Sequence, residues 1–260
     1  MAENGPGVVT DWNGYRRRDF IFEGWDAILV EPTAAALAKW DGAQPWIWRA
    51  RFFDAWPAVD RAVLERGFHV AYVDVADLFG GPEAVDRFDA YYEYLTAEQG
   101  LSRRPVLEGF SRGGLIIYNW AAANADKVCC LYGDAPVCDI RSWPGGLGVG
   151  VGNAECWPRC LAAHGLTEAD VEEFRGNPID RLEPLAAAGI PVIHVCGDAD
   201  DAVPQVENTD VLAARYRALG GRIEVIVKPG VGHHPHSLED PTPVVDFILA
   251  AWRERGEAPV

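Results

Sequence analysis

The sequence predicts an α/β protein with a mostly parallel, eight-stranded sheet, helices on both faces of the sheet and a short cap insertion. From residue 45 onward, short apolar runs alternate with longer amphipathic stretches, the pattern of parallel strands joined by helices. The chain has 260 residues, and 49% of them are hydrophobic, so it can bury one large core. We therefore treat residues 1–260 as a single domain.

The first two predicted strands, residues 19–23 and 27–31, have no helix between them and should form an antiparallel hairpin. Six further strands are expected at residues 45–49, 69–75, 105–109, 128–133, 191–196 and 223–228. Helices are expected at about residues 57–66, 82–99, 112–125, 167–174, 205–219 and 241–254. Parallel neighbours should be joined by right-handed crossovers.

The stretch from residue 139 to residue 189 interrupts this alternation. It is too long for a simple loop, and we interpret it as a small cap inserted after the sixth predicted strand. Its aromatic and basic side chains are candidates for lining a pocket: Arg141, Trp143 and Trp157.

Residues 105–114 read PVLEGFSRGG, a serine between an apolar strand and a glycine-rich start of a helix. Gly109 and Gly113 lie two positions either side of Ser111, where a sharp strand-to-helix turn needs small residues. Such a turn exposes the serine hydroxyl and aims the N-terminus of the next helix at it.

Polar side chains follow three of the predicted parallel strands, at the sheet edge where ligands bind in such folds. They are Ser111 after strand 105–109; Asp198, Asp200 and Asp201 after strand 191–196; and His233, His234 and His236 after strand 223–228. A serine hydroxyl becomes nucleophilic only beside a base, and that base needs a carboxylate to fix its tautomer. The sequence supplies each type of residue at this edge.

Three motifs in this order resemble those of the α/β-hydrolase superfamily, over about residues 19–254. They are Gly109-x-Ser111-x-Gly113, Gly197-x-x-Asp200-x-x-Val203-Pro204 and Gly230-x-Gly232-His233. The resemblance implies the α/β-hydrolase fold and a catalytic triad of Ser111, Asp200 and His233. Asp198 and Asp134 stay open as alternative acids, and His234 as an alternative base.

Two backbone N–H groups are expected to form an oxyanion hole, which stabilises the developing negative charge. One is that of Arg112, at the start of the helix after the nucleophile. The other should come from the loop after the third strand, at Arg49 or Ala50, although this loop lacks the family's usual His-Gly pattern. We expect Arg51 and Trp143 to contact the substrate, since a guanidinium pairs well with a carboxylate.

These residues predict a serine esterase that cleaves a small-molecule carboxylic ester through an acyl-enzyme. A narrower similarity to bacterial carbohydrate-esterase-like hydrolases favours a polar or carbohydrate ester; it lies in WRARFF, SWPGG and GVGHHPHSL. A serine peptidase of the prolyl-oligopeptidase type is the first alternative, disfavoured because only ~18 residues precede the first expected strand. A non-catalytic binding protein on the same fold is the second.

The formal net charge of −16 disfavours nucleic acid as a partner, because an acidic surface repels phosphates. No apolar run approaches the ~18 residues of a membrane span, and the first 20 residues contain no secretory signal pattern. We therefore expect a cytoplasmic protein that does not bind membranes, and a homo-oligomer is compatible with the sequence.

The six cysteines are expected to be free, buried thiols. Cys156 and Cys160 are spaced as zinc ligands are, but His164 alone does not complete a four-ligand site. The sequence therefore implies no metal and no organic cofactor.

Overall fold

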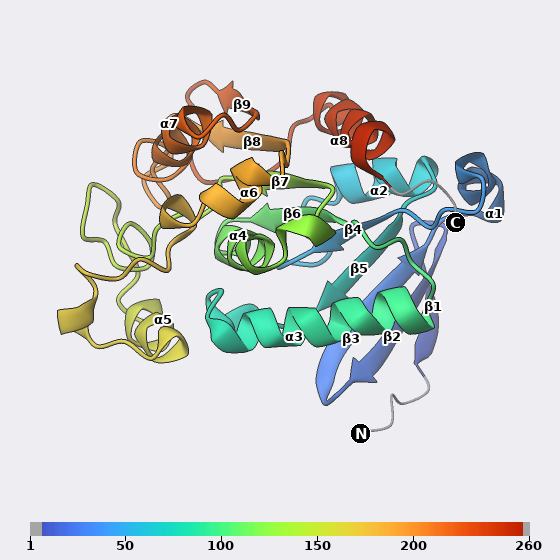
Figure 1. The fold of residues 1–260 in the computed structure, drawn as a ribbon, viewed down its shortest axis with the longest axis horizontal. Helices are drawn as coiled ribbons and strands as arrows, with labels where there is room; N and C mark the ends of the chain where they lie inside the picture. Colours follow the sequence, from blue (N-terminus) through green and yellow to red (C-terminus); the bar gives the residue numbers. More distant parts are fainter. Residues whose placement is uncertain (1–6, 257–260) are drawn as a thin grey trace.

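A computed structural model describes residues 7–256 of the chain (Figure 1). The two ends of the predicted domain, residues 1–6 and 257–260, lie outside this range. The strands are β1 (Val8–Trp12), β2 (Tyr15–Phe22), β3 (Trp25–Glu31), β4 (Trp46–Arg49), β5 (His69–Val73), β6 (Val106–Phe110), β7 (Cys130–Asp134), β8 (Val192–Gly197) and β9 (Ile223–Lys228). They form one sheet in the order β1-β2-β3-β5-β4-β6-β7-β8-β9.

The sheet is parallel from β5 through β9, whereas β1, β2 and β3 join it by antiparallel pairing. This confirms the predicted fold class, with one strand more than the predicted eight. The additional strand, β1, has four exposed residues in a row and therefore no alternation of apolar and polar positions. A local signal was present in Asn13-Gly14, whose positive φ angles of 54° and 88° make the tight turn into β2.

Helices cover both faces of the sheet. They are α1 (Ala34–Leu37), α2 (Ala58–Glu65), α3 (Pro82–Glu93), α4 (Gly113–Ala123), α5 (Cys156–His164), α6 (Glu183–Ala187), α7 (Thr209–Ala218) and α8 (Thr242–Arg255). In Figure 1, α2 and α8 lie together on one side of the sheet and α3 and α4 on the other, and each side packs its own apolar core. None of the helices within residues 7–256 is long and apolar enough to cross a membrane.

The central strands are buried on both faces, which explains their continuous apolar sequence. All four residues of β4 are buried, and the ring of Trp48 stacks on Phe88 of α3 with centroids 3.9 Å apart. Trp48 also meets the edge of Trp120 from α4 at 5.3 Å. This packing fixes the middle of the sheet, from which the loops at its carboxyl edge extend.

The longest helix of the inserted segment 139–189 is α5. The prediction of a helix at residues 167–174 is wrong. A single 3₁₀ turn, Glu168–Asp170, stands there instead, closed by reciprocal hydrogen bonds between Thr167 and Asp170. The chain then becomes extended at Asn177, since a residue before proline avoids helical geometry.

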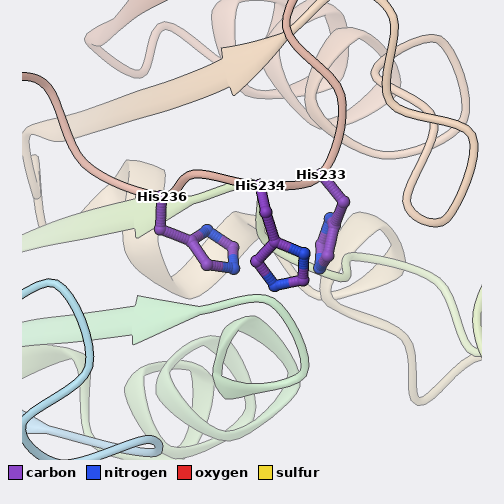
Figure 2. Close-up of side chains that lie close together, drawn as sticks. All are labelled: His233, His234 and His236. Atoms are coloured by element: carbon purple, nitrogen blue, oxygen red, sulfur yellow. The ribbon is translucent and has the colours of Figure 1, made fainter.

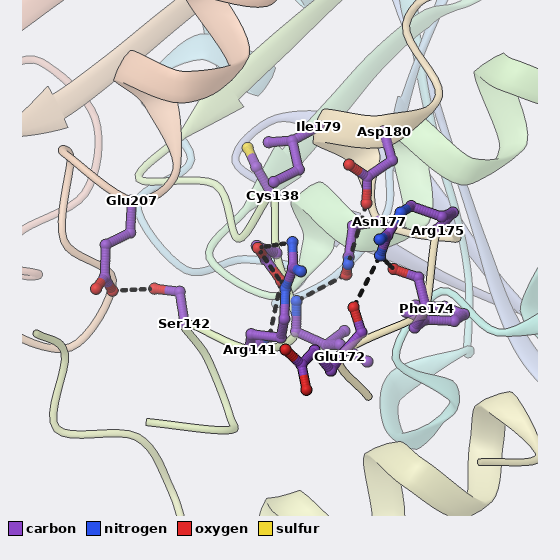
Figure 3. A network of polar contacts seen from close by, with 12 residues as sticks. Cys138, Arg141, Ser142, Glu172, Phe174, Arg175, Asn177, Ile179, Asp180 and Glu207 are labelled. Atoms are coloured by element: carbon purple, nitrogen blue, oxygen red, sulfur yellow. Dashed lines mark hydrogen bonds and ion pairs between the residues drawn. The ribbon is translucent and has the colours of Figure 1, made fainter. Parts of the chain in front are cut away.

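Polar contacts attach this segment to the body of the protein (Figure 3). The Ser142 hydroxyl donates to Glu207 at 2.7 Å and accepts from the Asn208 side-chain amide at 2.9 Å, whereas the bond from the Ile140 N–H to the Asn177 side-chain carbonyl, at 2.9 Å, lies within the segment. Glu207 belongs to the stretch between β8 and α7, so the segment is held at the sheet edge that β8 reaches. Trp143, next to Ser142, is thereby placed over that edge.

Candidate active site

Three side chains from three loops form a continuous hydrogen-bonded chain at the carboxyl edge of the sheet. His233 Nε2 lies 2.9 Å from Ser111 Oγ, and His233 Nδ1 lies 2.7 Å from Asp200 Oδ2. Ser111 follows β6, Asp200 follows β8 and His233 follows β9. The structure thus brings the residues of the predicted triad together in the geometry of a nucleophile, a base and an orienting carboxylate.

The carboxylate beside His233 belongs to Asp200 and to neither alternative. Asp200 is buried, and its Oδ1 accepts the Ala202 and Val203 N–H groups at 3.0 and 2.8 Å, which leaves Oδ2 aimed at the imidazole. Asp198 instead accepts the Gly230 N–H at 2.6 Å and closes the loop after β9.

Ser111 stands in a strained turn between β6 and α4. Its φ is +50°, a left-handed conformation that costs a non-glycine residue roughly 1–3 kcal/mol unless the surroundings hold it. Its N–H donates to the Asp134 carbonyl, and its own carbonyl accepts the N–H groups of Gly114 and Val137, each at 2.9 Å. These three bonds offset the strain and keep the hydroxyl pointed at His233.

The glycines around Ser111 are not equally necessary. A Cβ at Gly109 would lie 2.7 Å from the Gly113 carbonyl oxygen, and one at Gly114 would lie 2.7 Å from Pro136 and from the Val137 carbonyl oxygen. A Cβ at Gly113 would meet nothing closer than 3.5 Å. The prediction that position 113 needs a small residue is therefore wrong. Position 114 needs one instead, because the loop after β7 packs against Gly114.

A second imidazole–carboxylate pair lies beside the triad. His236 Nδ1 lies 2.7 Å from Asp134 Oδ1, while Asp134 Oδ2 accepts the Tyr132 hydroxyl at 2.8 Å and the Ser237 N–H at 2.9 Å. Asp134 is fully buried and His236 nearly so. Burial, together with the nearby Asp134 carboxylate, raises the pKa of Tyr132 well above its ordinary value, so Tyr132 stays a donor. Asp134 therefore serves His236 and holds the histidine loop.

The structure contradicts Arg49 as the second oxyanion donor. Arg49 is paired with Glu108 inside the sheet, three positions short of Ser111, and the Ala50 N–H donates to the Glu108 carbonyl at 2.9 Å. The Arg49 guanidinium is enclosed between Asp60 and Glu108, and its Cζ lies 4.2 Å from the centre of the Phe110 ring.

The members of this buried ionic cluster shift one another's pKa values. Burial raises the pKa of Glu108 well above its ordinary value, Asp60 adds to the rise, and Arg49 opposes it. Burial alone would lower the pKa of Arg49, but Asp60 and Glu108 together raise it. Arg49 therefore supplies the counter-charge of buried Asp60 and contacts the Glu108 carboxyl beneath the site.

The backbone of Arg51 lies at the site, whereas its side chain lies at another cavity. A Cβ added at Gly113 would lie 3.9 Å from the Arg51 nitrogen, so the Arg51 peptide lies against the nucleophile turn. The Arg51 side chain lines a different cavity of about 680 Å³, together with Arg17, Tyr72 and Asp74. Among the described residues, the Arg51 side chain is not part of the wall of the pocket at Ser111.

The pocket at Ser111 has a volume of about 250 Å³. Its walls are Phe52, Trp56, Ser111, Arg112, Trp143, Ala202, His233, His234 and His236. Trp143 is therefore where the sequence places it, whereas Arg141 is bound to Asp139 and Trp157 packs in the core of the inserted segment.

The Arg112 side chain is the positive charge of this pocket. Its Cζ lies 5.0, 5.6 and 5.9 Å from the ring centres of Trp143, Phe52 and Phe79. Arg112 Nη1 lies 3.9 Å from Asp77 Oδ1, which is a long distance for an ion pair. The buried Nε atom of Arg112 has no hydrogen-bond partner within residues 7–256. Burial lowers the pKa of Arg112. An arginine always stays charged in proteins, so the pocket presents a weakly paired cation.

No protein-family model matches the sequence, and no curated protein matches it. Solved structures do. A puromycin-hydrolysing peptidase from Mycobacterium tuberculosis is 15% identical with a TM-score of 0.67, and the match covers 93% of this chain and 40% of that one. The acylaminoacyl peptidase of Pyrococcus horikoshii is 16% identical with a TM-score of 0.67, covering 96% and 44%. Est1E from Butyrivibrio proteoclasticus is 19% identical with a TM-score of 0.62, covering 96% and 100%.

The chain has the α/β-hydrolase fold. It spans less than half the length of the two peptidases and the full length of Est1E. In this fold the turn at Ser111 and the loops that carry Asp200 and His233 all leave the carboxyl ends of parallel strands, which is why residues 122 positions apart meet.

The three histidines of the last loop also form a group that sequence reasoning missed as a unit. One ring nitrogen from each of His233, His234 and His236 lies within 4.8 Å of the others (Figure 2). The expectation that the protein has no metal site rested on Cys156, Cys160 and His164 alone. All six cysteines are buried free thiols. The signal available in the sequence was the H-H-x-H spacing itself.

The alanine substitutions at two adjacent glycines should differ in their effect on stability. Gly114→Ala should lower the free energy of unfolding by about 1–3 kcal/mol, because its Cβ would overlap the loop after β7. Gly113→Ala, its matched control, should change it by less than about 0.5 kcal/mol. Urea unfolding followed by circular dichroism measures both, and equal losses would contradict the geometry of the turn.

Replacing Arg49 should damage stability. We expect Arg49→Met to lower the free energy of unfolding by about 3–5 kcal/mol, chiefly because the Asp60 carboxylate would stay buried without its partner. The control is Arg61→Met on the exposed side of α2, expected to cost less than about 0.5 kcal/mol. A fully stable Arg49→Met protein would show that Arg49 does not support the fold.

Proposed function

We propose that this protein is a serine hydrolase that cleaves a small carboxylic ester through an acyl-enzyme. The observation that carries the proposal is the unbroken chain from Ser111 Oγ through His233 to Asp200, at the wall of a pocket. The α/β-hydrolase fold alone does not carry it, because the same fold also supports other activities.

The hydrogen bonds define a role for each side chain. His233 donates its Nδ1–H to Asp200, so its Nε2 lone pair is free to take the Ser111 proton while Oγ bonds to the acyl carbon. When the tetrahedral intermediate collapses, His233 returns the proton to the leaving alcohol. Water then loses a proton to His233 as its oxygen bonds to the acyl carbon. When this second intermediate collapses, the bond from the acyl carbon to Oγ breaks, the acid leaves, and His233 returns the proton to Ser111 Oγ.

The oxyanion would be held by two backbone N–H groups. The first is that of Arg112, which precedes α4, an eleven-residue helix whose positive end faces this point. The second is that of Arg51, which takes the place assigned to Arg49 because its peptide lies against the nucleophile turn.

The substrate class follows from the pocket. A space of about 250 Å³ suits a small molecule, and the Arg112 guanidinium among aromatic rings suits an ester with a carboxylate or another strongly polar group. A carbohydrate ester with such a group fits the same walls, and Trp143 could stack on it. A cytoplasmic location, the absence of nucleic-acid and membrane partners, and homo-oligomer formation stay predictions from the sequence.

A serine peptidase is the second candidate function. The likeness to the puromycin-hydrolysing and acylaminoacyl peptidases favours it, with TM-scores of 0.67 against 0.62 for Est1E. The match to the whole length of Est1E, an esterase, favours the ester reading. Both reactions would use the same triad, so they differ only in the leaving group that the pocket accepts. A non-catalytic binding protein is the third candidate function. In that case the hydrogen-bonded chain of Ser111, His233 and Asp200 would carry out no reaction.

Ester and amide turnover should separate the first two candidates. We expect hydrolysis of 4-nitrophenyl acetate and butyrate at rates well above those of aminoacyl 4-nitroanilides. Ser111→Ala and His233→Ala should each lower kcat by at least about 10³-fold, because the nucleophile and its base act as one unit. Circular dichroism checks that both variants are folded.

Three results would change the proposal. Faster cleavage of the anilides would make the protein a peptidase. An undiminished rate in Ser111→Ala would reject the serine mechanism. No turnover of any ester or anilide by the folded protein would favour the non-catalytic candidate.

Arg112 should select substrates by charge. Arg112→Met keeps the backbone N–H but removes the guanidinium, so KM for the 4-nitrophenyl monoester of succinate should rise about 10-fold or more. kcat for 4-nitrophenyl acetate should change less than about threefold, since that ester carries no anion. Arg175→Met is the control, because Arg175 is exposed and its guanidinium donates to the backbone carbonyls of Glu172 and Phe174. Equal KM changes for both esters would reject charge recognition.

A further inference from the structure

The loop after β9 brings three imidazoles to one side of the backbone. Figure 2 shows the rings of His233, His234 and His236 hanging next to one another from the same stretch of chain. Their ring centroids are 4.8 to 5.0 Å apart, and one nitrogen of each lies within 4.8 Å of the others. All three line the Ser111 pocket, so the cluster is open to small solutes.

Two of the three rings already have the outer hydrogen bond of a metal-binding histidine. In metal sites the ligating imidazole usually donates its other N–H to a carboxylate, which fixes the tautomer and makes the free nitrogen a better donor. His233 Nδ1 lies 2.7 Å from Asp200, and His236 Nδ1 lies 2.7 Å from Asp134. This leaves the Nε2 atom of each ring as the ligand atom.

Both carboxylates are rigidly held and supply negative charge close to the cluster. Asp200 accepts two backbone N–H groups, and Asp134 accepts the Tyr132 hydroxyl and the Ser237 N–H. A cation between the imidazoles would therefore lie near two buried carboxylates that do not need to move.

His234 completes the group as its exposed member. Its ring stacks on Trp56, with centroids 5.1 Å apart and an interplanar angle of 21°. The ring lines the Ser111 pocket, so its nitrogens can be reached by a dissolved metal ion.

We propose that His233, His234 and His236 bind a divalent transition-metal ion such as Zn²⁺ reversibly, and that the bound ion switches the enzyme off. Nitrogens that share a tetrahedral zinc ion lie about 3.4 Å apart, so the three ring nitrogens, which lie within 4.8 Å of one another, must draw together by small ring rotations when the ion binds. Imidazole ligands select Zn²⁺, Ni²⁺ or Cu²⁺ over Mg²⁺ and Ca²⁺.

Inhibition follows because one nitrogen has two uses. His233 Nε2 is the atom that accepts the Ser111 proton, and a metal ion on its lone pair prevents that transfer. The inhibition rests on the proposed hydrolase function, whereas the binding of the ion does not.

Metal binding is tested first, without reference to activity. Wild-type protein freed of metal with EDTA is dialysed against buffered Zn²⁺, and bound zinc is measured per chain. We expect one Zn²⁺ per chain, a dissociation constant at least about tenfold weaker in His234→Ala, and no change in His164→Gln. His164 is a suitable control because it lies in α5, outside the cluster. Equal zinc binding by wild type and His234→Ala would overturn the proposal.

The second measurement is the rate of 4-nitrophenyl acetate hydrolysis against free Zn²⁺, with each variant scaled to its own metal-free rate. Wild type should lose activity as zinc binds and regain it with EDTA, Mg²⁺ should have no effect, and His234→Ala should need at least about tenfold more zinc. A rate that rises with zinc, or stays constant while the site fills, would overturn the inhibitory role. If no variant hydrolyses any ester, the proposed function fails, and the dialysis still decides the metal site.

Discussion

Asp134, at the end of β7, is the residue on which the geometry of the site depends. Its backbone carbonyl accepts the Ser111 N–H and so holds the strained turn of the nucleophile. Its carboxylate binds His236 and the Ser237 N–H, and so holds the loop that carries the base. Because β7 pairs with β6 on one side and β8 on the other, this one buried residue ties the serine turn and the histidine loop to the centre of the sheet. The distance between Ser111 and His233 is therefore set by the core and not by the flexibility of two loops.

A buried ionic cluster supports the same turn from below. Arg49, Asp60 and Glu108 are almost completely enclosed, and the guanidinium lies against the face of Phe110, the residue before Ser111. Charges of this kind cost free energy to bury and stay acceptable only while they are paired. Two of the three lie on the adjacent strands β4 and β6, and the pairing connects those strands to α2. Arg49 thus stabilises the end of β6, from which the Ser111 turn begins, although it takes no part in the chemistry that we propose.

The pocket combines two kinds of recognition within a small space. Arg112 offers a positive charge framed by aromatic rings, whereas the histidine loop offers imidazole nitrogens whose rings are held by carboxylates. The first suits an anionic or strongly polar group of a substrate, and the second suits a metal cation. Since His233 belongs to both the triad and the imidazole cluster, proton transfer and metal binding compete for the same lone pair. Activity and metal availability would be linked through that single atom.

The sequence by itself determined the features that depend on neighbouring residues. The alternation of apolar runs predicted the parallel sheet, and the residues after three strands placed Ser111, a group of aspartates and a group of histidines at its carboxyl edge. The motif resemblance then favoured Asp200 and His233 within those groups. Only the tertiary structure decided the pairing of His236 with Asp134, which lies 102 positions away, and the enclosure of Arg49. It also decided that Gly114, and not Gly113, is sterically required, because the atoms in the way belong to the loop after β7. A local pattern indicates where a side chain leaves the backbone, but the partner it meets depends on how distant strands pack together.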